Sequence, residues 1–217
     1  MQTKISKKYL SKKFWNNKNV MITGINRFIG GNLAKKLINL NANVIGISNS
    51  QRKNKFLFFE DIAKYIKFHK IDISEYRKIK ELTNLYKIDI CIHLAAQVDV
   101  NIAKENPHLT FESNIKGTYN LLENLRNHKS IKSIIIASSD KAYGEYEFKD
   151  LPYKEHYDLR PLYPYDVSKA AADMIAKSYA TDLFKLPVMI TRFANIYGPG
   201  QLNFTALIPD CILANMG

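Results

Sequence analysis

Cysteine is scarce in this chain, since only Cys91 and Cys211 occur among its 217 residues. Two cysteines so far apart match neither a disulfide framework nor the spacing of a metal-binding module. We therefore expect no metal site and a reducing compartment, which makes the protein cytoplasmic.

Long apolar runs are absent too. Lysines near the N-terminus, such as Lys7 and Lys12, are followed by no uninterrupted apolar stretch, and no later segment reaches membrane-spanning length. We therefore expect no export signal and no membrane partner. The formal net charge is +12, but the lysines are scattered and no basic-aromatic module is present. A solvated surface is therefore favoured over a nucleic-acid partner.

Short apolar runs alternate with stretches of helical spacing along the chain. The expected strands are 20–22, 44–47, 68–71, 88–94, 131–137 and 187–191. The expected helices are 32–40, 74–86, 107–127 and 165–183. This alternation predicts an α/β protein with a Rossmann-like, doubly wound parallel sheet covered by helices on both faces.

The turn between the first strand and the first helix reads Thr23-Gly24-Ile25-Asn26-Arg27-Phe28-Ile29-Gly30. Such a turn can present backbone N–H groups to a pyrophosphate. Gly24 and Gly30 fill two of the three usual glycine places, but Arg27 fills the third. If that place needs a left-handed backbone, Arg27 costs about 1 to 2 kcal/mol. A strand-to-helix turn without a ligand is the alternative.

An acidic residue that binds the adenosine ribose is expected after the second strand. Ser48 and Asn49 occupy that place instead, and Arg52 and Lys53 follow. NADP therefore stays open beside NAD. Asp72, after the third strand, either contacts adenine or caps the following helix.

Tyr165 and Lys169 are four residues apart and share one face if their segment is helical. For a tyrosine to act as a base near pH 7, its pKa must fall by about 3 from about 10. A close ammonium and a positively charged nicotinamide can lower it. Ser139, Asp140 and Lys141 follow a strand at its carboxyl end, where ligands of doubly wound sheets bind. Taken alone, these segments also fit a helix surface and a strand-end ion pair.

These motifs resemble the extended short-chain dehydrogenase/reductases of the NAD-dependent epimerase/dehydratase family, from about Phe14 to Asp210. Two further segments carry the resemblance, His93-Leu94-Ala95-Ala96-Gln97 and Arg192-Phe193-Ala194-Asn195-Ile196-Tyr197-Gly198-Pro199-Gly200. Ser139-Asp140-Lys141 is similar to the triplet of sugar-nucleotide 4,6-dehydratases. Phe14-Trp15 and Leu207-Ile208-Pro209-Asp210 resemble the CDP-glucose 4,6-dehydratase branch.

The resemblance implies an enzyme that acts on a nucleotide sugar with bound NAD. Tyr165, with Ser139 and Lys169, would take the proton of the 4-hydroxyl. Lys141 would remove the proton at carbon 5 while Asp140 protonates the departing 6-hydroxyl. For this role Lys141 must be neutral part of the time, through burial or nearby positive charge.

The resemblance also implies where the ligands lie. The cofactor residues would be Gly24, Asn26, Arg27, Phe28, Ile29, Gly30, Asp72, Ile73, Leu94, Ala95, Ala96, Gln97, Asn114, Tyr165, Lys169 and Phe193. Asn195 would lie near the substrate diphosphate. Close packing is the alternative for the alanines, and helix capping for Asn114. We expect His93 to be a hydrogen-bonded strand-end residue rather than a catalyst.

The expected domains are a polar leader over 1–18, a dinucleotide-binding domain over 19–200, and the start of a truncated substrate-binding domain over 201–217. Three rival functions remain: a nucleotide-sugar 4-epimerase, a truncated or decayed relative that binds dinucleotide without catalysis, and a nucleotide-sensing scaffold. The resemblance also implies a homodimer that forms through two helices of each subunit.

Overall fold

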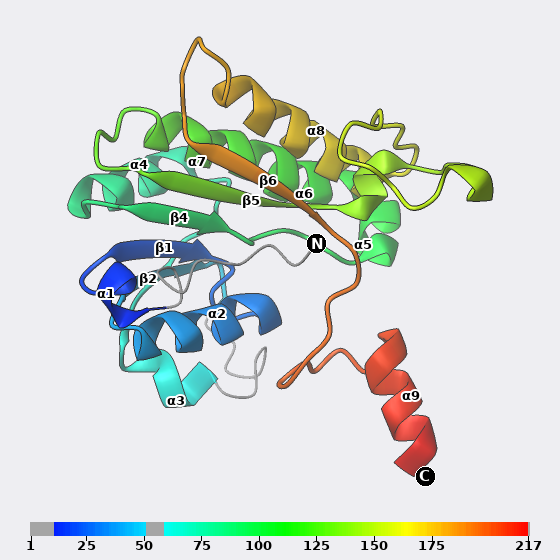
Figure 1. The fold of residues 1–217 in the computed structure, drawn as a ribbon, viewed down its shortest axis with the longest axis horizontal. Helices are drawn as coiled ribbons and strands as arrows, with labels where there is room; N and C mark the ends of the chain where they lie inside the picture. The colour runs from blue at the N-terminus through cyan, green and yellow to red at the C-terminus, as the bar shows by residue number, and fades with distance from the viewer. Residues whose placement is uncertain (1–10, 51–58, 217) are drawn as a thin grey trace.

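The computed structural model describes residues 11–50 and 59–216, so Arg52 and Lys53 lie outside the described residues. Within these ranges, six parallel strands form one sheet in the order β3-β2-β1-β4-β5-β6 (Figure 1). The strands are β1 (Asn19–Thr23), β2 (Asn43–Ser48), β3 (Ile66–Lys70), β4 (Ile90–His93), β5 (Ser133–Ser139) and β6 (Val188–Phe193). This order confirms the predicted Rossmann-like α/β fold, with its change of direction between β1 and β4.

Helices cover both faces of the sheet. The described α-helices are α1 (Lys12–Trp15), α2 (Phe28–Asn39), α3 (Phe59–Ala63), α4 (Tyr76–Leu85), α5 (Val100–Glu105), α6 (Pro107–Phe111), α7 (Gly117–Leu125), α8 (Pro164–Tyr179) and α9 (Leu207–Met216). Three shorter turns are the π-helical η3 (Glu112–Lys116) and the 3-10 turns η4 (Asp140–Tyr143) and η5 (Phe148–Asp150). None of the helices in the described ranges is long and apolar enough to cross a membrane.

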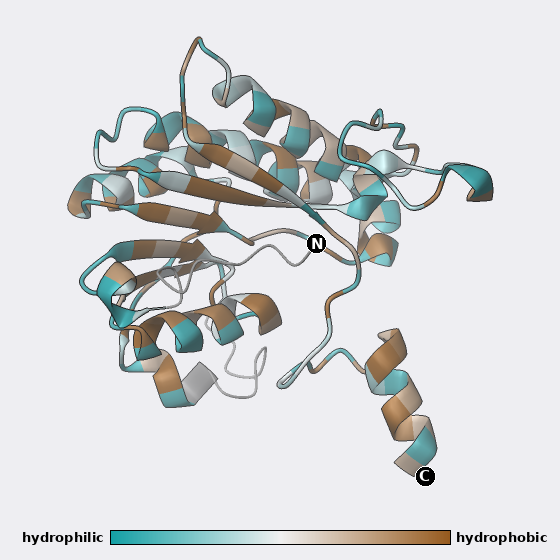
Figure 2. Cartoon of the chain, viewed as in Figure 1, coloured by the Kyte–Doolittle hydropathy of each residue, from teal (hydrophilic) through white to brown (hydrophobic). Residues whose placement is uncertain are grey.

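Alternate residues of β1 show how the two faces are filled. Met21 belongs to a buried cluster with side chains of α4, α7 and α8, whereas Ile22 belongs to a second cluster with side chains of α2 and α3. Burying a side chain of this size contributes about 1.5 to 3 kcal/mol. Because the central strands are buried on both faces, they are apolar nearly throughout, as Figure 2 shows in brown.

Most element boundaries differ by a few residues from the sequence prediction, and three of these differences follow from local structure. Helix α2 begins at Phe28 rather than at residue 32, because Arg27 is extended and the helix starts directly after the turn. Strand β5 extends to Ser139, where the prediction ended it at 137, since Ser138 and Ser139 pair with Arg192 and Phe193 of β6. The predicted helix 107–127 is interrupted by the π turn η3.

Four of the described helices were not predicted: α1, α3, α5 and α9. Helix α5 has only six residues, too few for a periodic signal, and Asp99 caps it by accepting the N–H groups of Asn101 and Ile102. Helix α9 lies apart from the sheet (Figure 1), and none of its residues is buried. Residues 12–15 of the predicted polar leader form α1, and Trp15 packs against the cluster of α2 and α3.

Candidate active site

The glycine turn after β1 has the backbone that a phosphate cradle needs. Gly24 has a φ of +71°, and its N–H donates to the Ile47 carbonyl over 2.8 Å. A Cβ at Gly30 would fall on the Gly24 carbonyl oxygen and 2.9 Å from the Ile25 Cα. Gly24 therefore requires glycine for its positive φ and Gly30 for space, and the turn leads directly into the N-terminus of α2, the kind of helix end that binds anions.

Arg27 fits this turn without strain. Its φ of −96° and ψ of 169° are extended, and its side chain is exposed. The left-handed penalty considered from the sequence does not arise, because the positive φ of the turn falls on Gly24 instead. Phe28 and Ile29 follow as the first residues of α2.

The cradle gives a first testable prediction. Gly30→Ala should destabilise the chain by about 1 to 3 kcal/mol or more, because backbone atoms on both sides of the new methyl group have little room to move. Urea unfolding would measure the loss. Gly198→Ala is the matched control, since its Cβ would meet nothing closer than the Phe28 ring at 3.6 Å. Equal urea midpoints for the two variants would contradict the close backbone contacts around Gly30.

Neutral polar groups lie where β2 ends. The buried Asn26 accepts a hydrogen bond from the Ser48 hydroxyl at 2.8 Å and donates to the Ser50 carbonyl at 2.6 Å. Asn49 donates to the Asp72 carboxylate over 3.1 Å. The described end of β2 thus presents hydroxyl and amide groups in place of the usual carboxylate.

Asp72 forms a hydrogen-bonded turn just before α4. Its carboxylate accepts the Ser74 N–H at 2.9 Å and the Ser74 hydroxyl at 2.7 Å. Burial raises the pKa of Asp72, but the bonds from Ser74 and Asn49 outweigh it and hold the pKa below its ordinary value. The next residue, Ile73, is buried in the cluster of α4, α7 and α8.

The loop after β4 is fixed against the glycine turn. The Thr23 hydroxyl accepts the N–H groups of Leu94 and Ala95 at 3.1 and 3.0 Å. A Cβ on Gly24 would lie 3.0 Å from the Ala95 nitrogen, so the two loops are in contact. Ala96 follows, half-buried. The structure therefore brings the predicted residues of both loops together.

Asn114 connects this loop to α8. Its side-chain oxygen accepts the Gln97 N–H at 2.7 Å, and its amide donates to the Gln97 carbonyl and to the Ser168 hydroxyl, both at 2.9 Å. Ser168 in turn donates to the Tyr165 carbonyl at 2.6 Å. Asn114 lies in η3, and π turns of this kind are frequent at functional sites.

His93 is held neutral by its partners. Its Nε2 lies 3.0 Å from the Thr118 hydroxyl, which itself donates to the Asn114 carbonyl, so Nε2 carries the proton. Its Nδ1 then accepts from the Thr23 hydroxyl at 2.7 Å. Burial, aided by the charge of Lys169, lowers the pKa of His93 to about 3. The structure thus confirms the expected hydrogen-bonded strand-end histidine.

This histidine predicts a loss of stability in acid. Below pH 6.5 the unfolded chain binds a proton at His93 that the folded chain refuses, so the free energy of unfolding falls by up to about 1.4 kcal/mol per pH unit until about pH 3. His93→Gln should flatten this slope in denaturant titrations between pH 7 and 4.5. His156→Gln, at an exposed histidine, should not. If the free energy of unfolding depended on pH equally in both variants, His93 would not be the group that is held neutral in the folded chain.

The two residues of the expected reactive pair lie on α8 and are both shielded. Lys169 is 7% exposed, and its Nζ donates to the Ala137 carbonyl at 2.7 Å. Burial lowers the pKa of Lys169 to about 8. Burial raises the pKa of Tyr165, while the Ser139 hydroxyl opposes the increase and the charge of Asp140 adds to it. The lowering expected from an ammonium together with a bound nicotinamide concerns the occupied site and stays a prediction.

Charged groups gather where β5 ends. The Ser139 hydroxyl donates to Asp140 at 3.0 Å and accepts the Lys141 N–H at 3.2 Å, which starts η4. Lys141 itself is exposed. Burial raises the pKa of Asp166, with Lys141 lowering it and Asp140 and Glu145 raising it further. Asp166 was not identified from the sequence, although it lies inside the Tyr165–Lys169 spacing.

The remaining predicted residues lie at the edge of this group. Phe193 ends β6 directly opposite Ser139, and its side chain is 40% exposed. Asn195 is exposed on the segment that leads to α9. The structure thus brings the glycine turn, the loop after β4, the end of β5 and α8 to the carboxyl edge of one sheet, with Asn195 beyond it.

Comparisons with known proteins identify the family to which the chain is similar. A family profile described as GDP-mannose 4,6 dehydratase matches residues 21–216. The dTDP-D-glucose 4,6-dehydratase of Dictyostelium discoideum is 36% identical over 196 residues, which cover 84% of this chain and 44% of that protein. The CDP-glucose 4,6-dehydratase of Salmonella typhimurium is 28% identical over 212 residues, covering 94% and 59%.

A solved structure shows the same fold. The UDP-glucose 4-epimerase of Thermus thermophilus, in complex with NAD, superposes with a TM-score of 0.75 at 28% identity, covering 84% of this chain and 57% of that one. The chain therefore spans about half the length of these relatives. The profile match, the sheet order and the arrangement of the motifs agree, and the chain belongs to the NAD-dependent epimerase/dehydratase family.

Proposed function

We propose that the chain is a nucleotide-sugar 4,6-dehydratase that works with bound NAD and takes CDP-glucose or a related nucleotide sugar. The observation that carries the proposal is the placement of Ser139, Asp140 and Lys141 at the end of β5, beside Tyr165 of α8. An alcohol-oxidising group and an acid/base pair of opposite types thus share one strand end.

The residues present fit the dinucleotide. Gly24 and Gly30 let the turn pack tightly against the backbone around it, and the N-terminus of α2, which follows the turn, would supply N–H groups to the pyrophosphate. Ala95 and Ala96 would lie along the cofactor, and Asn26 and Asn49 near the adenosine ribose. These neutral groups support NAD and do not exclude the 2′-phosphate of NADP. When bound, the nicotinamide takes a hydride from carbon 4 and returns it to carbon 6.

Tyr165 would take the proton from the 4-hydroxyl as the hydride leaves. Its raised pKa keeps the phenol protonated in the ligand-free chain, so the base must form when positive charge arrives beside it. Lys169 would hold that charge in the buried site and orient the sugar. Ser139 would bridge the substrate oxygen and the phenol.

Lys141 and Asp140 would perform the elimination. The new ketone acidifies the neighbouring C5–H, whose proton passes to the Lys141 amine. The C6–O bond then breaks, and the hydroxyl leaves as water with a proton from Asp140. Lys141 is exposed in this chain, so the burial that would make its amine neutral part of the time would come from the bound substrate. Asn195 would contact the substrate diphosphate.

A 4-epimerase is the second candidate, and the exposure of Lys141 favours it because epimerisation needs no elimination base. The test is to incubate the chain with CDP-glucose and NAD and to analyse the sugar. A 4-keto-6-deoxy product supports the dehydratase, and a 4-epimer supports the epimerase. Cofactor binding without any product would show the truncated or decayed relative that catalyses nothing.

A further inference from the structure

Arg192 of β6 forms a buried ion pair with α8. Its Nε and Nη2 donate to the two carboxylate oxygens of Asp173 at 2.7 and 3.1 Å. The Asp173 side chain is 1% exposed and that of Arg192 is 20% exposed. Two parallel bonds of this kind fix the orientation of the guanidinium as well as its distance.

The third nitrogen of the same guanidinium contacts a different part of the chain. Nη1 donates to the Tyr143 hydroxyl at 2.9 Å and to the Glu155 carbonyl at 3.0 Å. Tyr143 is 5% exposed, and the guanidinium carbon lies 4.7 Å from the centre of its ring. All three nitrogens of the Arg192 guanidinium therefore donate hydrogen bonds within the protein. The bond to Asp173 also raises the pKa of Arg192 above its ordinary value.

The partners of Arg192 are attached to the two halves of the proposed site. Asp173 lies four residues after Lys169 on α8, so both follow Tyr165 along one face of the helix. Tyr143 is the last residue of η4, two residues after Lys141. Arg192 thus links the helix that carries the redox pair to the turn that carries the acid/base pair.

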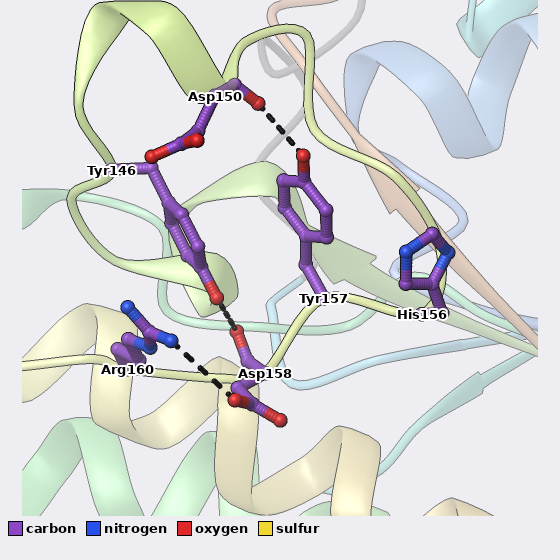
Figure 3. Close-up of a pocket in the computed structure, with 6 residues that line it drawn as sticks. All are labelled: Tyr146, Asp150, His156, Tyr157, Asp158 and Arg160. Carbon is purple, nitrogen blue, oxygen red and sulfur yellow. Dashed lines mark hydrogen bonds and ion pairs between the residues drawn. The ribbon is translucent and has the colours of Figure 1, made fainter.

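The loop between η4 and α8 is held by contacts of its tyrosines. Tyr153 stacks on Tyr143 with ring centres 4.9 Å apart. Further along, Tyr146 donates to the Asp158 carbonyl and Tyr157 to the Asp150 carbonyl, each at 3.0 Å, around a pocket of about 370 Å³ (Figure 3). Arg192 contacts this same loop at the Glu155 carbonyl.

We propose that Arg192 is a positioning residue that holds Asp140 and Lys141 in register with Tyr165, so that the oxidised sugar goes on to dehydration. The inference rests on the proposed dehydratase function. Redox and elimination groups lie on separate elements, and near-attack geometry fails when they are displaced by about 1 Å. Replacing the planar fork with a lysine ammonium would keep the charge beside Asp173 and lose the connection to Tyr143.

The test is Arg192→Lys, assayed with CDP-glucose and NAD and quenched with borodeuteride. The quench labels carbon 4 of every ketone, so hexoses report oxidation alone and 6-deoxyhexoses report completed dehydration. We expect the ratio of labelled hexose to labelled 6-deoxyhexose to rise at least tenfold, with KM changed less than threefold. Tyr143→Phe should shift the ratio in the same direction and by less.

Arg126→Lys is the control, because Arg126 also forms two bonds to one carboxylate, that of Glu123 on α7. It should leave the ratio unchanged. A wild-type ratio in Arg192→Lys overturns the inference even if turnover falls, since a general loss of folded protein lowers both products equally. A wild-type chain that makes no dehydrated sugar overturns the proposed function, and the inference with it.

Discussion

Replacing Lys169 with methionine is expected to lower turnover by about 10² to 10⁴, the usual contribution of a positioned acid/base group. The loss follows because the substrate oxygen and the Tyr165 phenol would no longer have a cation beside them in a buried site. Methionine keeps the length of the lysine stem, so packing around the residue changes little.

The same variant should be more stable than the wild type at pH 7. Burial lowers the pKa of Lys169 from 10.5 to about 8, so below pH 8 the folded chain pays the full cost of a shielded ammonium. Removing the shielded ammonium therefore adds about 3 kcal/mol to the free energy of unfolding of the variant. Losing the hydrogen bond to the Ala137 carbonyl subtracts roughly 1 kcal/mol. The free energy of unfolding of the wild type rises between pH 8 and 10.5, because the folded chain has released the Lys169 proton there and the unfolded chain still holds it.

Urea unfolding at pH 7 and at pH 9.5 would measure both effects. The stability difference between variant and wild type should be near 2 kcal/mol at the lower pH, as an order-of-magnitude figure, and shrink at the higher pH. Lys177→Met, at an exposed position of the same helix, is the control and should change neither turnover nor the pH dependence. A Lys169→Met chain that is active, or less stable at pH 7, would sink the assignment.

Lys141→Ala should separate the two halves of the reaction. Nicotinamide reduction should persist, because the redox pair on α8 is untouched, whereas dehydrated product should fall by about 10³. The near-ultraviolet absorbance of the reduced nicotinamide reports the first half, and 6-deoxyhexose formation reports the second. Lys141 is exposed, so folding should be unaffected.

Lys149→Ala is the matched control for this variant. Lys149 lies on the same loop and forms only an exposed ion pair with Glu147, which contributes little. It should retain both half-reactions. Loss of reduction and dehydration together in Lys141→Ala would mean that Lys141 orients the substrate rather than taking the C5 proton.

The fold was largely predictable because its central strands are buried on both faces. A residue such as Ile22 or Ile45 needs no alternation to be identified, since its sequence neighbours within the strand are buried as well. The short α5 and the π turn at Asn114 were not predictable, because neither leaves a periodic signal. The start of α2 was hidden because glycines weaken the helical pattern of its first turn.

The site was predictable where a motif specifies the backbone, as at Gly24, and much less so where it depends on packing. The neutral state of His93 results from burial and from the charge of Lys169, and its tautomer is set by Thr118, a partner 25 residues away. The cluster of Arg192, Asp173 and Tyr143 joins three elements that no spacing rule connects. The pKa of Tyr165 also depends on burial and on neighbours brought there by the fold, so the residue type alone does not give its direction in the ligand-free chain.

The parallel sheet also determines when the cradle becomes complete during synthesis. Strand β2 is synthesised soon after β1, but the other edge of β1 has no partner until β4 is made, as the pairing of Val20 with Ile90 and the bond of Thr23 to His93 require. At about 5 to 20 residues per second, those 70 residues take roughly 4 to 14 seconds to follow. Throughout that interval Gly24 lacks the Ala95 loop beside it. A dinucleotide therefore meets a finished site only after β4 is in place, and it can stabilise the fold without guiding its first steps.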